Sequence, residues 1–513
     1  MNNTSPAREK PHVQQIINST HRKMFAVKVV FHYNSIEIVK VKKNKIILSK
    51  IIILICAITL VSAHSTHANK EVKRKPNLIF ILADDLGYGD LGCFGQKKIK
   101  TPNLDRLASE GMKLTQFYAG STVCAPSRCV LMTGLHTGHA YIRGNGRHNL
   151  RPSDFTVAEL LKKANYSTGC FGKWGLGNEG TDGIPTKQGF DSFYGYLHQG
   201  HAHNYYPTFL INNERRIKLR NIPAQESKTG AGWASIRIDY SHDLITESAM
   251  HWIDMNHNKQ FFLYLPFTIP HANNEGKRGT KDGQEVPDYG IYKNKKWTNQ
   301  NKGQAAMITR MDSDIGRIVS KLNKYKITNN TLIIFTSDNG HHREGGNDPE
   351  FFDANGPLRG MKRDLYEGGI RVPTIAYWPT HIEAGSTSDH PFYFGDLMAT
   401  AAELAGVTPP TALDSISFLP TLVNETNRQK KRDFIYWEFL EKKGAQALVI
   451  GETGRWKALR KESEEAPIEI YDLENDIGEQ NNIASDHPEI VSKAEELFKT
   501  EHVSNPLWKN PFE

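Results

Sequence analysis

The chain has 513 residues, of which 38% are hydrophobic and 23% are charged, an ordinary balance for a globular protein. Its net charge of +8 comes from the first 68 residues, which hold 10 of the 64 Lys and Arg and only 2 of the 56 Asp and Glu. Residues 69–513 therefore carry 54 charges of each sign, and this balance argues against nucleic acid as a partner.

We interpret residues 1–68 as a leader with an export signal peptide. Lysines precede the apolar run Ile51–Ala63, which is shorter than the roughly 20 residues of a membrane span. Small residues favour cleavage after Ala63 or Ala68, so we expect no stable membrane span after cleavage and a role for the export machinery. The translation start is open, with Met24 as a candidate, because the stretch before the lysines is long for a signal peptide.

The five cysteines are too few for a disulfide scaffold in a chain of this length. Cleavage of the leader would remove Cys56, which follows Ile55 rather than the small residue of a lipoprotein site. The remaining four are Cys93, Cys124, Cys129 and Cys170.

From residue 69 to about residue 430 the chain reads as strands alternating with helices. The continuous apolar run Asn77–Ala83 is typical of a central parallel strand buried on both faces. This order predicts an α/β catalytic domain with a large mixed, mostly parallel sheet sandwiched by helices. The other expected strands are Tyr166–Phe171, Phe261–Pro266, Thr331–Thr336 and Thr374–Trp378, and the expected helices are Leu104–Glu110, Val157–Ala164, Ala305–Leu322 and Leu397–Ala405.

Residues 431–513 are predicted to form a smaller C-terminal subdomain with an antiparallel sheet. Its strand-like pieces are shorter, and an amphipathic stretch near Pro488–Phe498 predicts a final helix. The expected strands are Phe434–Phe439, Ala447–Ile450, Trp456–Leu459 and Glu469–Tyr471.

Two polar pairs, Asp84-Asp85 and Asp338-Asn339, follow predicted strands. Either pair alone is more often a helix cap or a turn. In open α/β sheets, however, ligand sites gather at the carboxyl ends of strands. Three carboxylates and an amide make a hard oxygen site, suited to Ca²⁺, with Mg²⁺ as the other possibility.

The stretch CAPSR at residues 124–128 is the most specific motif in the chain. A lone Cys is usually a small buried hydrophobe, and a Cys near an Arg also fits a thiolate nucleophile. Cys-x-Pro-x-Arg, however, is the recognition sequence of formylglycine-generating enzymes. The longer stretch to Thr133-Gly134 resembles the type I sulfatase signature, with Met132 where that signature usually has Leu.

Two lysines lie close to glycines. Lys173 stands in GKWGLG, after a predicted strand, and Lys362 stands in LRGMK. A lone Lys is nearly always solvated, but glycines allow close backbone approach, and a Lys near metal ligands is well placed to meet an anion. We interpret Glu367–Gly369 as structural.

From about Lys75 to its C-terminus the chain resembles type I, formylglycine-dependent sulfatases of the alkaline phosphatase superfamily, and among them bacterial arylsulfatase-A-like glycan sulfatases. Order and spacing agree throughout. The further landmarks are Pro76-Asn77, Thr101–Asp105, Gly189–Asp191, Pro270-His271 and Tyr471–Leu473. The resemblance implies a bacterial sulfuric ester hydrolase that is periplasmic or secreted and that needs a formylglycine-generating enzyme during maturation.

The resemblance also implies roles for individual residues. One Ca²⁺ would be held by residue 124 and the two polar pairs, Asp84, Asp85, Asp338 and Asn339. Formylglycine at position 124 would be hydrated to a gem-diol, of which one hydroxyl attacks sulfur and the other loses its proton to release sulfate.

Four further residues complete the implied site. Arg128 would hold the nucleophile, while Lys173 and Lys362 would neutralise the sulfate. His271 would bind sulfate and protonate the leaving oxygen, since the pKa of a His lies near neutrality.

One position departs from the family pattern. The family usually reads GKWHLG, and its His contacts the gem-diol as the base, whereas this chain has Gly175. We hypothesise that another His supplies the base, although each alone is more often an ordinary surface or hydrogen-bonded residue. The candidates are His136, His139, His198, His201 and His203.

We predict that the substrate is a sulfated glycan attacked from its end, with galactose-configured sugars as the first guess. Tyr205 and Tyr206 could stack on a sugar, although such aromatics are more often packing residues. In the C-terminal subdomain, Trp437, Glu438 and Gln446 could reach a sugar hydroxyl, although a place on an exposed sheet face is equally expected for them. The predicted substrate-binding residues are His136, His201, His203, Tyr205 and Glu438.

Two other functions remain open at this point. A phosphodiesterase or phosphonate hydrolase of the same superfamily would need extra cationic help or a second metal, and the ligand set supplies one metal. A non-catalytic glycan-binding protein on the same fold is favoured only by Gly175.

Overall fold

The computed structural model describes residues 74–146, 148–441 and 444–508. Residues Lys73–Glu513 form one compact unit, and the expected leader with its apolar run and cleavage sites lies outside the described residues. No helix in the described part of the chain has the length and apolar character needed to cross a bilayer.

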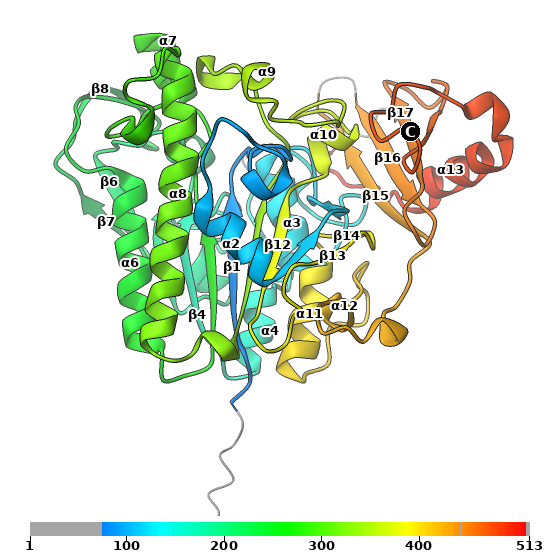
Figure 1. The fold of residues 1–513 in the computed structure, drawn as a ribbon, viewed down its shortest axis with the longest axis horizontal. Helices are drawn as coiled ribbons and strands as arrows, with labels where there is room; N and C mark the ends of the chain where they lie inside the picture. The colour runs from blue at the N-terminus through cyan, green and yellow to red at the C-terminus, as the bar shows by residue number, and fades with distance from the viewer. Residues whose placement is uncertain (1–73, 147, 442–443, 509–513) are drawn as a thin grey trace, which may run out of the picture. The chain divides into compact units, whose positions relative to one another are not determined.

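A ten-stranded mixed sheet forms the centre of this unit (Figure 1). Five adjacent strands in its middle run parallel, and the pairs toward both edges are mostly antiparallel. The strands in spatial order are β13 (Ser386–Ser388), β2 (Met112–Leu114), β12 (Thr374–Tyr377), β11 (Thr331–Ser337), β1 (Asn77–Ala83), β10 (Phe261–Pro266), β4 (Ser167–Lys173), β5 (Ser192–Tyr196), β6 (Phe209–Asn212) and β7 (Arg215–Lys218).

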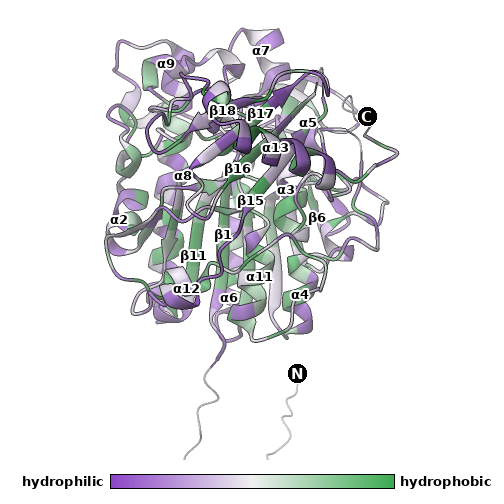
Figure 2. Cartoon of the chain, turned by 90° about the vertical axis from the view of Figure 1, so that its right-hand side faces the viewer, coloured by the Kyte–Doolittle hydropathy of each residue, from purple (hydrophilic) through white to green (hydrophobic). Residues whose placement is uncertain are grey.

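Helices cover both faces of this sheet, because β1 presents apolar side chains to both. Leu78, Phe80 and Leu82 belong to one core, and Ile79 and Ile81 belong to the other. Figure 2 shows hydrophobic residues along the central strands. The first core is closed by α3 (Cys124–Thr133), α4 (Val157–Lys163) and α11 (Asp396–Ala405), and the second by α2 (Pro102–Glu110), α6 (Ser241–Asn256) and α8 (Asn299–Lys324).

Local sequence sets the ends of several helices. Thr156 and Glu159 form a capping box at the start of α4. Gly134 ends α3 in the left-handed conformation, with φ of 74°, and its N–H donates to Val130 O. The smaller elements are β3 (Phe117–Tyr118), α5 (Gln199–Ala202), β8 (Ile222–Glu226), β9 (Gly232–Ile236), α7 (Asn274–Thr280), α9 (Pro349–Phe352), α10 (Glu367–Ile370), β14 (Phe392–Tyr393) and α12 (Leu419–Leu422).

The predicted fold class is confirmed, and each expected strand and helix is present within a few residues of its predicted bounds. One difference concerns the segment 374–378, which pairs antiparallel with β11 rather than parallel. Two of the helices that cover the sheet were not among those predicted: α3, which carries the Cys124 motif, and α6.

The C-terminal sheet is antiparallel, as expected, and consists of β15 (Phe434–Phe439), β16 (Ala445–Ile450), β17 (Trp456–Lys461) and β18 (Glu469–Asp472). One of its faces, with Trp437, joins the first main core, and the other packs against α13 (Pro488–Thr500). Both faces are therefore covered. The boundary near residue 430 stays a prediction.

A buried ion-pair network links the small sheet to the segment after β11. Lys457 of β17 lies 2.8 Å from Glu367 and 3.7 Å from Glu479, and all three side chains are fully buried. Glu367 N also donates to Glu479 Oε2 at 2.8 Å. This arrangement supports the structural role predicted for Glu367.

Replacing Lys457 with Met is therefore expected to lower the free energy of unfolding by about 3–5 kcal/mol, because Glu479 loses its paired cation and Glu367 keeps only Arg371, at 3.3 Å. Chemical denaturation measures this loss. The matched control is Lys461→Met on the same strand, whose partly exposed pair with Glu469 at 2.7 Å should contribute less than about 1 kcal/mol. Equal losses in the two variants would contradict the network's role.

Candidate active site

The two predicted metal-binding pairs lie side by side. Strands β1 and β11 are parallel neighbours with Ala83 opposite Ser337, so Asp84 and Asp338 leave the sheet at the same edge. The next residue, Asp85, has a positive φ of 65°, a strained conformation that Asp tolerates better than most residues and that is common at functional sites. Its N–H donates to Asp338 Oδ1 at 3.2 Å.

The neighbouring parallel strands add two more predicted residues at this edge. Lys173 is the last residue of β4, and its Nζ lies 2.7 Å from Asp84 Oδ2. His271 follows β10, and its Nε2 lies 3.4 Å from Asp85 Oδ2. The carboxyl ends of adjacent parallel strands thus build the site, as the position of ligands in open α/β sheets predicts.

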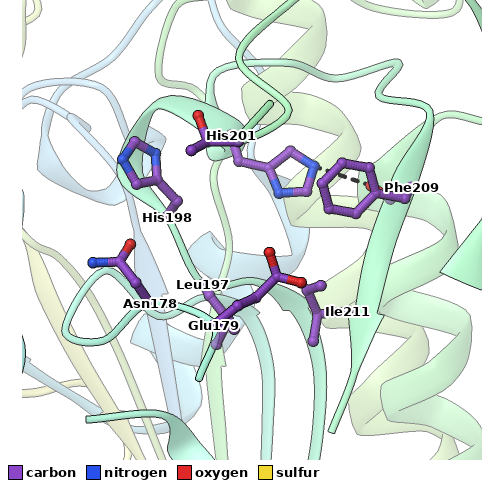
Figure 3. A pocket seen from close by; sticks show the side chains of 8 residues that line it. Asn178, Glu179, Leu197, His198, His201, Phe209 and Ile211 are labelled. Carbon is purple, nitrogen blue, oxygen red and sulfur yellow. Dashed lines mark hydrogen bonds between the residues drawn. The ribbon is translucent and has the colours of Figure 1, made fainter. Parts of the chain in front are cut away.

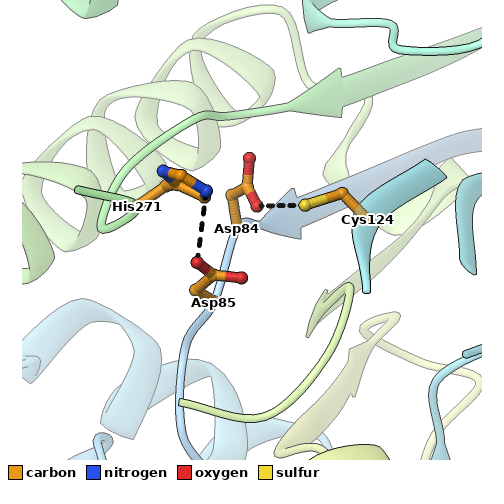
Figure 4. A group of neighbouring side chains, drawn as sticks. All are labelled: Asp84, Asp85, Cys124 and His271. Atoms are coloured by element: carbon orange, nitrogen blue, oxygen red, sulfur yellow. Dashed lines mark hydrogen bonds and ion pairs between the residues drawn. The ribbon is translucent and has the colours of Figure 1, made fainter. Parts of the chain in front are cut away.

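Cys124 enters the site from the first position of α3. Its Sγ lies 3.3 Å from Asp84 Oδ1, as Figure 4 shows. One turn later on the helix, Arg128 donates to Asp338 Oδ2 from Nε at 3.1 Å and from Nη2 at 2.8 Å. It also donates to the Lys173 carbonyl at 2.5 Å, which fixes the guanidinium between the helix and β4.

Lys362 closes the opposite side of the site. Its Nζ lies 2.7 Å from Asp85 Oδ2 and 3.2 Å from His271 Nε2. His271 Nδ1 lies 2.7 Å from the Ala272 carbonyl, which assigns the ring proton to Nδ1 and leaves Nε2 as the acceptor facing Lys362. Burial and the charge of Lys362 lower the pKa of His271 well below its usual range, so the ring is neutral here.

The buried charges in this site are unevenly compensated. Burial alone would raise the pKa of Asp84, but the charges of Lys173, Arg128 and Lys362 together lower it well below its usual range. Asp338 differs, because burial and the charge of Asp84 raise its pKa to about 7 despite Arg128. A divalent cation would relieve this excess of negative potential.

The donor set fits a hard cation. Asn339 Nδ2 donates to Asp85 Oδ1 at 2.7 Å, whereas the buried Asn339 Oδ1 has no hydrogen-bond partner. An unpartnered buried amide oxygen beside three carboxylates is available to bind a cation. Asp84, Asp85, Cys124 and His271 also place ligand atoms within 4.8 Å of one another.

The Cys124 thiol is a poor nucleophile as it stands. Burial, together with the charge of Asp84, raises its pKa far above the usual range, so the thiol keeps its proton at neutral pH. The reading of residue 124 as a plain thiolate therefore finds no support in this geometry.

Two of the predicted histidines belong to a separate cluster. His136 and His139 stack with ring centroids 4.1 Å apart. His139 Nδ1 lies 3.0 Å from Asp414, and His136 Nε2 lies 3.2 Å from Glu501. His136 Nδ1 accepts the Gly138 N–H at 3.1 Å, so the ring proton lies on Nε2. This tautomer favours a hydrogen bond from His136 to Glu501 over a role as a metal ligand.

Glu438 does not reach a surface on which a sugar could bind. It is fully buried, and its carboxylate accepts hydrogen bonds from Arg143 at 2.7 Å and Tyr436 at 2.9 Å. Trp437 and Gln446 are fully buried as well. Neither expectation for these residues, contact with a sugar or a place on an exposed sheet face, is met, because packing covers both faces of the small sheet.

The segment 198–206, which is rich in His and Tyr, has some residues at the site and others buried behind it. His203 stacks on His271 with centroids 4.5 Å apart, and its Nδ1 lies 3.1 Å from Glu275. Tyr205 is fully buried and donates to the His271 carbonyl, so it positions that segment instead of facing a sugar. His201 is buried against Phe209, and burial lowers its pKa to about 3.

Gly175 leaves a gap beside the active site. Its φ is +77°, and an added Cβ would meet nothing closer than Gln199 Nε2 at 3.4 Å, with Arg128 Cδ at 3.8 Å. His198 and Gly175 both line a small hollow at this gap. Of the five candidate bases, His198 and His203 are thus the two that the structure brings to the neighbourhood of the site.

Sequence reasoning missed two residues of the site. His342 is buried, its Nε2 lies 3.9 Å from Asp85 Oδ2, and it stacks on His271 at 5.8 Å. Glu344 lies 3.6 Å from Lys362 and 2.7 Å from Arg363. Their position a few residues after Asp338-Asn339, at the same strand end, was the available signal.

Family comparison gives a consistent result. A family model described as Sulfatase matches residues 76–407, and one described as N-sulphoglucosamine sulphohydrolase, C-terminal, matches residues 360–502. The chain is 32% identical to human N-acetylgalactosamine-6-sulfatase over 71% of this chain and 68% of the relative. It is 29% identical to the N-acetylgalactosamine-6-O-sulfatase of Bacteroides thetaiotaomicron over 84% and 94%.

Among solved structures, Ps i-CgsB in complex with k-i-k-neocarrahexaose superposes with a TM-score of 0.70 at 30% identity and covers 85% of this chain and 95% of its own. The fold, the residues gathered at its strand ends and the match over most of the chain all point to the same family. The chain is a member of the sulfatase family of the alkaline phosphatase superfamily, and it is a sulfatase enzyme.

Proposed function

We propose that this protein removes sulfate from a carbohydrate sulfate ester, with a formylglycine made from Cys124 as nucleophile and one Ca²⁺ as cofactor. The observation that carries the proposal is the convergence of three buried carboxylates, three cations and Cys124 at one sheet edge. A formylglycine-generating enzyme would modify Cys124, and the leader would direct export to the periplasm or beyond.

Asp84, Asp85, Asp338 and Asn339 would hold the Ca²⁺. Carboxylate and amide oxygens suit this ion, and Mg²⁺ is the alternative. The ion would neutralise the carboxylates and polarise sulfate oxygens. A hydrated formylglycine would supply an oxygen nucleophile that the protonated Cys124 thiol cannot replace.

The cations of the site have separable tasks. Arg128 orients residue 124 by tying α3 to Asp338 and to the Lys173 carbonyl. Lys173 and Lys362 are both buried, and their Nζ atoms would neutralise the charge of a sulfate bound beside residue 124.

The leaving oxygen needs a proton, and in this structure Lys362 Nζ holds the proton that faces His271 Nε2. We infer that Lys362 keeps this proton and neutralises the sulfate, and that His271, when its ring is protonated, gives a proton from Nε2 to the leaving oxygen.

The substrate class follows from the relatives. Two of them are named as sulfatases of N-acetylgalactosamine, which supports a galactose-configured sugar in a sulfated glycan. A phosphodiesterase or phosphonate hydrolase remains the alternative to test. The predicted ligands Asp84, Asp85, Asp338 and Asn339 supply one metal site, which favours sulfate, whereas phosphate chemistry would call for a second ion at the neighbouring group Asp85, His342 and Glu344.

The first test measures sulfate and phosphate release from matched aryl esters by protein co-expressed with a formylglycine-generating enzyme. Sulfate release should dominate, and Cys124→Ala should lower it on the order of 10³-fold or more. Cys170→Ala, another buried cysteine, is the matched control and should keep the activity. Dominant phosphate release would sink the proposal.

A second test measures the melting temperature with and without Ca²⁺. Ca²⁺ at 100 times its Kd should stabilise the fold by about 2.7 kcal/mol, because it binds only the folded site. Asn339→Ala should remove most of this shift, and Asp414→Asn, in the separate histidine cluster, should keep it. A shift that depends on Asp414 and not on Asn339 would place the ion elsewhere.

A third test concerns the base that replaces the family His at Gly175. We infer that His198 or His203 fills this role, because His198 lines the hollow at Gly175 and His203 stacks on His271 in the site. One of the two Ala variants should lower kcat by about 10²–10⁴-fold, while His139→Ala serves as control. Full turnover in both variants would remove the histidine hypothesis.

A further inference from the structure

A polar hollow opens beside the nucleophile where Gly175 follows β4. Its volume is about 160 Å³. Asn145, one of its lining residues, accepts the Ala125 N–H at 2.9 Å and the Gln199 amide at 3.3 Å. The hollow therefore reaches the N-terminal turn of α3, where Cys124 lies.

A second hollow, of about 290 Å³, adjoins the first. The two share Asn178, Leu197 and His198 as lining residues. Figure 3 shows His198, His201, Phe209, Ile211 and Glu179 arranged around this second hollow. Taken together, the volumes of about 160 Å³ and 290 Å³ lie within the range of about 300–1,000 Å³ that is usual for ligand pockets.

The lining combines the two kinds of group that bind sugar rings. Amide and imidazole groups of Asn145, Asn178, His198 and Gln199 can bond hydroxyls, and Leu197, Phe209 and Ile211 offer apolar faces. Such a mixture suits a ring with polar edges and apolar faces.

The charge of the lining differs from that of the catalytic site. Among the described residues that line both hollows there is no Lys or Arg. The carboxylate of Glu179 is paired with Arg216, at 2.8 Å and 2.6 Å. Arg216 also stacks on the lining residue Phe209, 4.0 Å from the ring centroid, but its charge is already paired with Glu179, so a neutral sugar fits this lining better than a second sulfate.

We propose that the two adjoining hollows bind the unsulfated sugars next to the sulfated one, and that Gly175 opens the way for them. This inference rests on the proposed function and deepens it, because it makes the substrate an oligosaccharide rather than a single sugar. A side chain at position 175 would occupy the passage between Arg128 and Gln199.

The test compares kcat/KM for sulfate release from disaccharides and hexasaccharides of two series, one on the neocarra-oligosaccharide backbone and one ending in N-acetylgalactosamine 6-sulfate, each carrying a single sulfate on its terminal sugar. In at least one series the wild type should prefer the hexasaccharide at least ten-fold. Thr229→Trp, which fills the second hollow from its exposed rim, should reduce this ratio to about one. Thr229→Ser and the equally exposed Thr426→Trp are controls that should keep it.

A wild-type ratio near one, or a preference that survives Thr229→Trp, would overturn the inference. If the wild type released no sulfate from any ester, the proposed function would fail instead. Calorimetric binding of the same hexasaccharides would then decide on the hollows. The inference is supported if the wild type binds a hexasaccharide and Thr229→Trp binds it ten-fold more weakly. It is overturned if the two proteins bind equally well or if the wild type does not bind.

Discussion

Burial of three carboxylates at one sheet edge is the constraint on which the rest of this structure depends. Asp84, Asp85 and Asp338 have no exposed surface, and ionised groups in such a place must be compensated. The parallel pairing of β1 and β11 forces them together. Each therefore has a cation within 2.8 Å, supplied by Lys173, Lys362 and Arg128 respectively.

The same burial decides what residue 124 can do. A low-dielectric site filled with carboxylates keeps the Cys124 thiol protonated, so it works against thiolate chemistry. The same surroundings strengthen the attraction between the lysines and a bound sulfate. A neutral oxygen nucleophile and an anionic substrate are therefore the chemistry that this environment favours, and the proposed formylglycine would supply that nucleophile.

The sequence allowed the prediction of those parts of the site that follow strands. Apolar runs located β1 and β11, and the rule for parallel sheets then brought Asp84 and Asp338 together. Residues placed by tertiary packing were harder to predict. The sequence around Glu438 predicts either contact with a sugar or a place on an exposed sheet face, but α13 and the main core cover both faces of that sheet. His342 depends on a loop path that no periodicity reveals.

The most direct measurement relates specific activity to the fraction of chains that carry formylglycine. Preparations made with graded amounts of a formylglycine-generating enzyme would be assayed for sulfate release, and the peptide with residue 124 would be weighed by mass spectrometry. We expect activity to rise in proportion to the modified fraction and to vanish when Cys124 is unmodified. Undiminished sulfate release from protein with an intact Cys124 would contradict the proposed nucleophile.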